Sequence, residues 1–167
     1  MTHLYNAMPG FHHRDPGPIP AAVEHPEVTA EIIADGVHIH PAMVRLAFDL
    51  FGDDRMILIS DTLRAVGLGD GVYDLGGQDV TVKGPVATID AGNLAGSVSD
   101  LMRCFTVAVK DMGIPLVSAI KAASVNPARA IGLTDRGVIA PGKIADAVIL
   151  DQDLAIQAVV VRGMVLA

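Results

Sequence analysis

The sequence has no tryptophan, a single cysteine and few aromatic residues, which make up 4% of the chain. The lone Cys104 excludes an internal disulfide framework and is typical of a protein in a reducing compartment. Basic residues are also scarce, since 12 Lys and Arg stand against 19 Asp and Glu and give a formal net charge of −7. This acidic balance argues against nucleic acid or an anionic membrane surface as a partner.

Long apolar runs are absent as well. No segment approaches the roughly 18 apolar residues that a membrane span needs, and residues 1–6 lack the basic start and apolar run of a secretory signal. We therefore expect a soluble, cytoplasmic protein. The chain is nevertheless 51% hydrophobic, which excludes intrinsic disorder, and its 167 residues are enough to bury the core of one domain.

Histidine is confined to the first 40 residues of the sequence. The positions are His3, His12, His13, His25, His38 and His40. Five prolines and two glycines fall within residues 8–26, so this stretch is predicted to be an irregular but ordered loop.

A strand–helix–strand pattern follows this loop. Residues 32–39 are a short, β-branched apolar run that ends in polar residues, which predicts a buried strand. Pro41 suits the first turn of a helix whose apolar face continues to Phe51, and Gly52 is placed to close it. Residues 56–59 repeat the strand pattern. A βαβ unit of this kind predicts a parallel sheet, with the site beyond the carboxyl ends of its strands.

A hairpin and a helix are predicted next. After a glycine-rich excursion over residues 67–77, residues 79–89 have the pattern of a β-hairpin. Ser97 with Asp100 resembles a capping box that opens a helix, and Gly113 is placed at the end of that helix. Its apolar positions predict an inward face made of Val98, Leu101, Met102, Phe105 and Val109.

The last part of the chain changes from helix to short strands. A helix is predicted from Pro115, with Asn126-Pro127 breaking it. Its predicted inward face comprises Leu116, Ala119, Ile120 and Ala123. From Gly137 onward, turn residues bound several short strands, beginning with residues 137–140. The chain is therefore predicted to be α/β to about residue 132 and β-rich beyond it.

Two polar residues at predicted strand ends are the clearest candidates for chemistry. Asp61 follows a buried strand and can act as a general base that activates water and returns the proton to a leaving group. The alternative for Asp61 is a helix or turn cap formed with Thr62. His38 follows Asp35-Gly36 and can contact a substrate, whereas the alternative is a hydrogen-bonded side chain at a bend that Gly36 allows.

Further candidates lie near the amino terminus. His3 is a candidate metal ligand because neutral imidazole is a common zinc donor, with a surface histidine as the alternative. Arg14, in the charged cluster 12–15, suits a bidentate contact with phosphate or carboxylate. The alternative for Arg14 is a solvated loop, which can include an internal Arg14–Asp15 pair. Cys104 is expected to be a small core residue.

Seven segments together carry a family resemblance. They are THLYNAMP (2–9), HRDPG (13–17), IADGVH (33–38), ISD (59–61), LAGS (94–97), AASVNPAR (122–129) and PGKIAD (141–146). In this order they resemble the carboxyl-terminal part of the N-acetylglucosamine-6-phosphate deacetylases, which are (β/α)8-barrel, metal-dependent hydrolases of the amidohydrolase superfamily.

The resemblance implies an α/β fold with two parts. Residues 1–132 would be the carboxyl-terminal part of a (β/α)8 TIM barrel, from the end of strand six through strand eight and the following helices, with a hairpin excursion near 78–90. Residues 133–167 would be the carboxyl-terminal strands of a small β-sandwich.

The resemblance also assigns roles to individual residues. It implies that His3 is a metal ligand, that Asn6 and Ala7 belong to a phosphate-holding loop, that Arg14 reaches the sugar phosphate of a neighbouring subunit, that His38 contacts the substrate and that Asp61 is the catalytic acid/base. A divalent metal, zinc, and a homodimer are implied as well.

The activity implied is hydrolysis of the acetamide of N-acetyl-D-glucosamine 6-phosphate to glucosamine 6-phosphate and acetate. Barrel strands one to five and the Glu and His that complete the family's metal site have no counterpart in this sequence, so an incomplete enzyme is expected. Two alternatives stay open. The chain can be a non-catalytic remnant that binds sugar phosphates or dimerises, or one half of a split enzyme.

Overall fold

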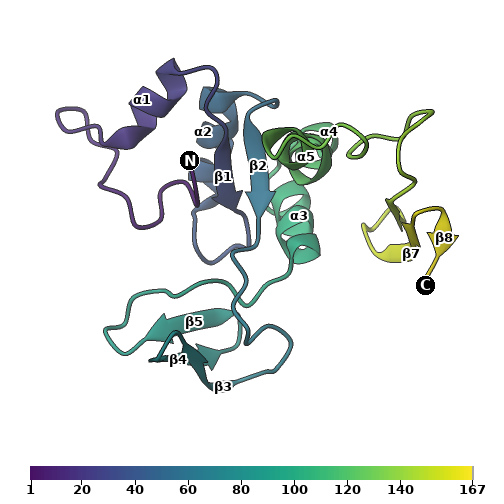
Figure 1. Cartoon of the computed structure of the whole chain (residues 1–167). Helices are drawn as coiled ribbons and strands as arrows, with labels where there is room; N and C mark the ends of the chain where they lie inside the picture. The colour runs from purple at the N-terminus through teal and green to yellow at the C-terminus, as the bar shows by residue number, and fades with distance from the viewer. Residues whose placement is uncertain (167) are drawn as a thin grey trace.

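A two-stranded parallel sheet lies at the centre of the molecule. In a computed structural model that describes residues 1–166, β1 (Ala30–Ile33) runs beside β2 (Met56–Ile59) in parallel register. The helix α2 (Pro41–Phe51) connects the two strands, so the predicted βαβ unit is confirmed. Both strands point toward the same end of the molecule (Figure 1).

The first strand is shorter than predicted. It stops at Ile33 because the Asp35 carboxylate accepts hydrogen bonds from the backbone amides of Val37 and His38, at 2.9 and 3.0 Å. Such a side-chain contact offers the backbone an alternative to the sheet ladder. Residues 34–39 therefore form a turn at the carboxyl end of β1 rather than its continuation.

The bounds of α2 match the prediction. Pro41 occupies its first turn, and the His40 ring accepts a hydrogen bond from the Ala42 amide at 3.2 Å. Gly52 closes the helix with φ of +70°, and its amide donates to the Phe48 carbonyl at 2.8 Å. The buried face of α2 comprises Val44, Ala47, Phe48 and Phe51.

A short helix lies inside the stretch predicted to be irregular. α1 (Pro18–Glu24) begins with a proline at its first position and buries Ile19 and Ala22. The prediction of an irregular loop over residues 8–26 is therefore wrong for α1, because a proline that disrupts a helix interior is favoured in its first turn.

The next helix starts later than the capping-box prediction. α3 (Leu101–Lys110) is capped by Asp100, whose side chain accepts from the Arg103 amide at 2.7 Å. Ser97 lies outside the helix, so its predicted capping role is wrong. Leu101 is largely exposed rather than inward, whereas Cys104 is fully buried as predicted.

The helical segment after Pro115 continues through the predicted break. α4 (Leu116–Ile120) passes into the π-helical turn η1 (Lys121–Val125) and then into α5 (Asn126–Ala130). The wider turn accommodates Pro127, which lacks an amide donor. The inward face agrees with the prediction at Ala119 and differs from it at Leu116 and Ile120. Leu116 and Ile120 are exposed, while Ser118, Ala119, Ala122 and Asn126 are buried.

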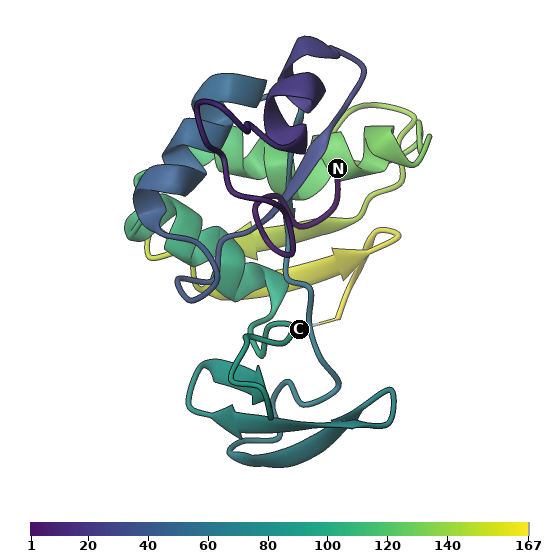
Figure 2. The same cartoon turned by 90° about the vertical axis from the view of Figure 1, so that its left-hand side faces the viewer.

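Two antiparallel sheets complete the fold. One consists of β3 (Gly71–Leu75), β4 (Gln78–Lys83) and β5 (Val86–Ile89). The predicted hairpin corresponds to β4 and β5, while β3 lies in the glycine-rich stretch and was not predicted. This sheet lies beyond the carboxyl ends of β1 and β2, as Figures 1 and 2 show.

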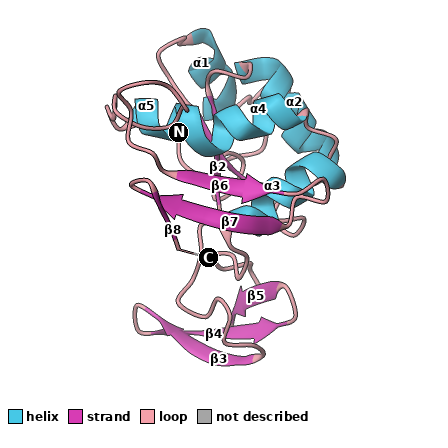
Figure 3. Ribbon diagram, turned by 90° about the vertical axis from the view of Figure 1, so that its right-hand side faces the viewer, coloured by secondary structure: helices cyan, strands magenta, loops and turns pink. Residues whose placement is uncertain are grey.

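The second antiparallel sheet consists of β6 (Ala147–Leu150), β7 (Ile156–Val161) and β8 (Met164–Val165). The helices α3 to α5 separate it from the parallel sheet (Figures 1 and 3). None of the residues in these three strands is buried. Residues 137–140 form no strand, so that prediction is wrong.

The main core packs the parallel sheet against the helices. It joins Ile32 and Leu58 of the sheet to Val44 of α2 and Phe105 of α3. A smaller cluster under β3 to β5 contains Ala65, Val80, Val82 and Ala87. Within residues 1–166, no helix has the length and apolar character that crossing a membrane requires.

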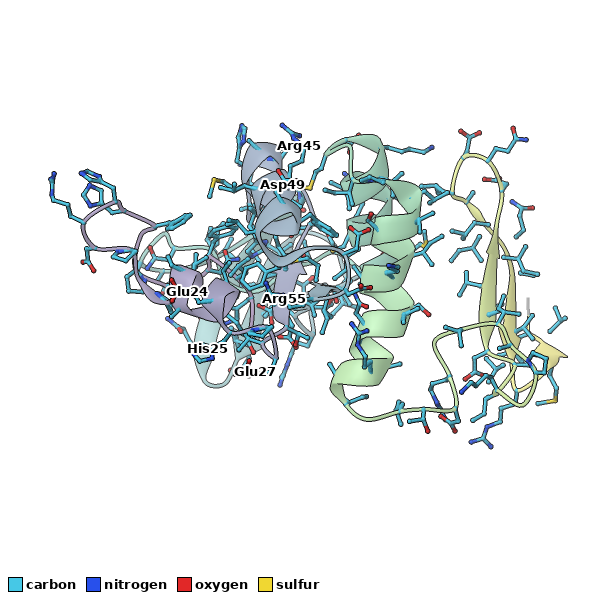
Figure 4. All side chains as sticks on the ribbon, turned by 90° about the horizontal axis from the view of Figure 1, so that it is seen from above. Glu24, His25, Glu27, Arg45, Asp49 and Arg55 are labelled. Carbon is cyan, nitrogen blue, oxygen red and sulfur yellow. The ribbon has the colours of Figure 1, made fainter. Side chains whose placement is uncertain are left out.

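Arg55 connects two helix ends at the amino-terminal end of the parallel sheet. Its guanidinium donates to the carbonyls of Phe51, His25 and Val23, at 3.0, 3.0 and 3.3 Å. It also lies 5.1 Å from the centroid of the Phe51 ring. Figure 4 shows Arg55 next to the residues that end α1, Glu24 and His25. One side chain thus satisfies carbonyls that the helix ends leave without partners.

We expect Arg55→Met to lower the free energy of unfolding by about 1.5–3 kcal/mol, because a hydrogen bond to a charged group contributes this much and the carbonyls would lose their donor. Urea unfolding followed by circular dichroism measures the change. Arg64→Met is the control, since the Arg64–Asp74 ion pair is solvent-exposed and should matter by less than about 1 kcal/mol. Equal effects of the two substitutions would contradict this role of Arg55.

Candidate site at the carboxyl ends of the parallel strands

Three chain segments bring candidate residues to one edge of the parallel sheet. The turn after β1 carries Asp35 and His38, and the residues after β2 carry Asp61. The amino-terminal segment runs alongside β1, because the Met1 amino group donates to the Thr29 carbonyl at 2.7 Å and the Met1 carbonyl accepts from the Glu31 amide at 2.9 Å. This segment places His3 beside β1, because the amide of the next residue, Leu4, donates to the Glu31 carbonyl at 2.7 Å.

Several candidate residues have left-handed backbone conformations. His3, Ala7 and Asp61 have φ values of 37°, 54° and 49°, and Tyr5 between the first two has φ of 75°. A residue other than glycine in this region costs on the order of 1–3 kcal/mol and persists only where its surroundings impose it. Such residues cluster at functional sites, which supports a site composed of residues 3–7 and Asp61.

The Asp35 carboxylate is buried and fully hydrogen-bonded. One oxygen accepts from the Val37 and His38 amides. The other oxygen contacts His38 Nδ1 at 2.8 Å and accepts from the Ser97 hydroxyl at 2.7 Å. Burial acts to raise the pKa of Asp35, but the hydrogen bonds from His38, Val37 and Ser97 outweigh it and hold the pKa well below its usual range. Asp35 is therefore ionised.

Both ring nitrogens of His38 face oxygen atoms that can only accept. Nδ1 meets the Asp35 carboxylate, and Nε2 lies 3.0 Å from the Ala95 carbonyl. The ring can satisfy both acceptors at once only as an imidazolium, with a proton on each nitrogen. The hydrogen bond to Asp35 raises the pKa of His38 against the opposing effect of burial, and the Ala95 carbonyl and the charge of Asp61 raise it further. His38 is thus hydrogen-bonded within the chain, and its side chain is 6% exposed.

Asp61 lies next to the segment that His38 contacts. Its carbonyl accepts a hydrogen bond from the Ser97 amide at 2.9 Å, and Thr62 pairs with Ser97 in a parallel bridge. The residue itself is exposed, so its carboxylate is open to a ligand. Its predicted alternative role, a cap formed with Thr62, is not observed, because the Thr62 hydroxyl donates to the Ser99 carbonyl at 2.7 Å.

His3 has one feature of a metal ligand and lacks the rest of a site. Its Nδ1 atom is buried with no hydrogen-bond partner, which is the arrangement expected of a nitrogen reserved for another ligand. A catalytic zinc centre requires about three protein ligands. Over residues 1–166, no group of three or more His, Cys, Asp or Glu side chains is placed to hold a metal ion. The described residues therefore do not form a metal centre by themselves.

The candidate phosphate-binding residues lie in two loops. The backbone amide of Asn6 donates to the backbone carbonyl of His3 at 2.9 Å. This bond closes the loop that also contains Ala7. Arg14 is exposed in a different loop, and its guanidinium contacts the His13 ring at 2.9 Å. The structure gives Arg14 no contact with the other site candidates, and the predicted pair with Asp15 is not observed among its contacts.

Sequence reasoning missed Ser97 and Ala95 as members of this site. Ser97 was interpreted as a helix cap, yet it is 1% exposed and bonded to Asp35. A signal was present in the sequence, because Gly96 allows close approach of the backbone and a serine after it can bond a carboxylate. Ala95 contributes only its carbonyl, which no sequence pattern reveals.

The chain is similar to proteins of known family and structure. The sequence matches the amidohydrolase family over residues 1–166. It is 44% identical to N-acetylglucosamine-6-phosphate deacetylase of Bacillus subtilis (strain 168), in an alignment that covers 98% of this chain and 41% of that protein. The chain thus spans less than half the length of this relative.

Two further similarities bear on length and fold. A protein of Escherichia coli (strain K12), provisionally named N-acetylgalactosamine-6-phosphate deacetylase, is 38% identical over 96% of both chains. The solved structure of an N-acetyl-D-glucosamine-6-phosphate deacetylase variant from Mycobacterium smegmatis, in complex with N-acetyl-D-glucosamine-6-phosphate, matches with a TM-score of 0.91 and 42% identity. That match covers 98% of this chain and 44% of the other.

The His38–Asp35 pair predicts a defined pH dependence of stability. Because the pKa of His38 is raised above its ordinary 6.5, its contribution is complete below pH 6.5 and is lost as the pH rises through the raised value. Because the pKa of Asp35 is lowered from 3.8, its contribution is present above that pH and is lost in stronger acid. The pair should stabilise the fold most between these two limits.

Urea unfolding of wild type and His38→Gln at pH 5.5 and pH 9 tests this dependence. We expect the substitution to cost about 1.5–3 kcal/mol at pH 5.5, the range of a charge-assisted hydrogen bond, and less at pH 9. His25→Gln is the control, because the His25–Glu27 pair is exposed. A cost for His38→Gln that is the same at both pH values would refute the charged pair.

Proposed function

The chain belongs to the amidohydrolase family, and on this premise we propose that it serves in hydrolysis of the acetamide of N-acetylated hexosamine 6-phosphates. The products would be the amino-sugar 6-phosphate and acetate, with N-acetyl-D-glucosamine 6-phosphate as the first candidate substrate. One observation carries the proposal. The exposed Asp61 and the charged His38 lie at neighbouring strand ends and are joined through residues 95–97.

In the proposed mechanism Asp61 moves the proton. Its carboxylate takes a proton from water while the water oxygen bonds to the carbonyl carbon of the acetamide, whose C=O double bond opens to a single bond. The same carboxyl group then protonates the nitrogen as the C–N bond breaks, which releases the amine and acetate. Asp61 suits this role because it is exposed at the mouth of the sheet and its backbone is held by Ser97.

Substrate binding is assigned to residues around Asp61. We propose that Asn6 and Ala7 hold the phosphate in their loop, that His38 contacts the substrate in exchange for its bond to the Ala95 carbonyl, and that Arg14 reaches the phosphate bound to a neighbouring subunit of a homodimer. The exposed position of Arg14 supports a contact outside its own chain. A guanidinium pairs with phosphate bidentately, which suits this role.

Amidohydrolases generally depend on a metal, and we propose that a divalent ion, zinc, is used with His3 as one ligand. The buried Nδ1 of His3 supports the assignment. Because the described part of the chain supplies no group of three ligands, no catalytic step is derived through the metal. The remaining ligands would have to come from another polypeptide segment.

The architecture is assigned on the same grounds. We propose that residues 1–132 form the last strands and helices of a (β/α)8 barrel and that residues 133–167 form part of a β-sandwich, with Ala167 outside the described residues. The parallel pair β1–β2 with its helices supports the first part. The antiparallel sheet β6–β8 supports the second.

A second candidate function is favoured by the incomplete metal site and by exposed apolar side chains. The most exposed of these are Leu68, Val117, Ile131, Ile139, Met164, Val165 and Leu166. Where such side chains gather into one patch, another polypeptide can cover them. The chain would then bind sugar phosphates without catalysis, or act as one half of a split enzyme.

Acetate release tests the enzymatic proposal. The chain is assayed with Zn²⁺ and the 6-phosphates of N-acetylglucosamine and N-acetylgalactosamine, alone and with the amino-terminal part of the Bacillus subtilis relative. Where turnover is found, we expect Asp61→Asn to reduce it by at least about 100-fold, the lower range for loss of a general base. Asp53→Asn is the matched control, because Asp53 is exposed and its side chain makes no hydrogen bond within residues 1–166.

The outcomes separate the two functions. Turnover by the chain alone establishes an enzyme, and turnover only in the mixture establishes half of a split enzyme. Ligand binding by calorimetry without turnover in either case supports the binding module. Turnover that survives Asp61→Asn would overturn the role of Asp61.

Exposed apolar surface also predicts self-association. We expect sedimentation velocity to show a dimer whose fraction rises with protein concentration over the micromolar range. Ile139, at 94% exposure, is the most accessible of these side chains, and Ile139→Lys should shift the equilibrium toward monomer if this surface takes part. A single monomeric species at all concentrations would refute self-association.

A further inference from the structure

The segment Ala95-Gly96-Ser97 bridges the two strand ends that carry the candidate site residues. On one side, the Ala95 carbonyl accepts from His38 and the Ser97 hydroxyl donates to Asp35. On the other side, the Ser97 amide donates to the Asp61 carbonyl at 2.9 Å. This segment lies before α3 and comes from neither strand, so it is a third element that holds the ends of β1 and β2 in one arrangement.

Ser97 contacts both sides through different atoms. Its hydroxyl reaches Asp35 Oδ2 at 2.7 Å, and its amide and carbonyl pair with Asp61 and Leu63. The side chain is therefore separable from the backbone in an experiment. Removal of the hydroxyl weakens the hold on Asp35, while the backbone pairing with Asp61 can persist.

Gly96 determines how closely this segment approaches Asp61. A Cβ atom at this position would lie 2.7 Å from the Asp61 carbonyl oxygen and 3.0 Å from a methyl carbon of Leu63. The first contact is with backbone, which cannot move aside as a flexible side chain can. Any residue other than glycine would therefore displace the backbone of Asp61, which has a left-handed φ of 49°.

We propose that Gly96 and Ser97 are positioning residues of the site: Ser97 keeps His38 charged and oriented by anchoring Asp35, and Gly96 permits the close backbone contact that orients Asp61. That His38 and Asp61 then meet a substrate rests on the proposed function, but the positioning itself does not. The segment lets one short loop control two groups that come from different strands.

The charges around His38 make the effect of Ser97 measurable. Asp35, on the same turn, contacts the ring directly, and Asp61, from the end of β2, acts on it through its charge. The segment 95–97 brings no charged side chain and contributes a carbonyl and a hydroxyl. Loss of the Ser97 hydroxyl leaves both carboxylates in place, so a change in His38 titration reports the anchoring of Asp35.

Nuclear magnetic resonance of the full chain tests the proposal without requiring turnover. The His38 ring signals are assigned with His38→Gln and titrated in wild type, Ser97→Ala and the control Ser99→Ala. The Ser99 side chain makes no hydrogen bond within the described residues. We expect Ser97→Ala to shift the His38 titration midpoint downward, Ser97→Thr to restore it by retaining a hydroxyl, and Ser99→Ala to leave it unchanged.

The effect of Gly96 is measured on Asp61. We expect Gly96→Ala to move the Asp61 amide and side-chain carboxyl resonances while the Ser97 hydroxyl still bonds Asp35. Gly10→Ala is the matched control, since a Cβ at Gly10 meets nothing within 4 Å. Thermal unfolding by circular dichroism identifies the variants that fold.

Three results would overturn the proposal. They are an unchanged His38 midpoint in folded Ser97→Ala, unchanged Asp61 resonances in folded Gly96→Ala, and a neutral His38 ring in wild type at pH 6. The last result would overturn the proposal even if both variants fail to fold. If the resonance results hold while no acetate is released in any assay, the proposed function fails and the positioning role stands.

Discussion

The arrangement of the site depends on a carboxylate buried at the end of a strand. Asp35 is 3% exposed, and an ionised carboxylate in such a position is tolerated only when its oxygens are hydrogen-bonded. Two amides of its own turn, one imidazolium and one hydroxyl satisfy it. These four partners end β1, orient His38 and attach the segment that contacts Asp61. The need to stabilise one charge therefore determines the local backbone of three separate segments.

Local sequence predicted the elements that depend on local physics. The strand–helix–strand unit was recognisable from Pro41, Gly52 and two short β-branched runs, because caps and periodic burial act over a few residues. The place of Asp61 near the carboxyl end of β2 was predictable for the same reason, since it follows the apolar run of that strand with only Ser60 between them. Cys104 was also predicted correctly, because a small apolar thiol within a helical face packs in the core.

The errors share a physical cause in long-range partners or compensating backbone geometry. Ser97 resembled a helix cap because its partner, Asp35, lies 62 positions away in the chain. The two interpretations of His38 could not be separated, since its second acceptor is a backbone carbonyl of a distant residue. Asn126-Pro127 suggested a break, but a π-helical turn and the bonds from Asn126 to the Asp53 and Met56 carbonyls hold the helix together. The roles proposed for Arg14 and for a metal at His3 would need partners outside the described residues, which no local pattern specifies.

The parallel pairing of Thr62 with Ser97 has a consequence for how this part of the fold can vary. The chain leaves the end of β2 and returns beside it, with the Leu63 amide bonded to the Ser97 carbonyl at 2.8 Å. Everything between them, including β3 to β5 and their small core, is an insertion whose two ends are already held together. The entropic cost of closing a loop between fixed ends grows only slowly with the length of the loop. The insertion can therefore vary in length and sequence among related chains, while the paired residues at its two ends, Thr62 and Ser97, keep their register.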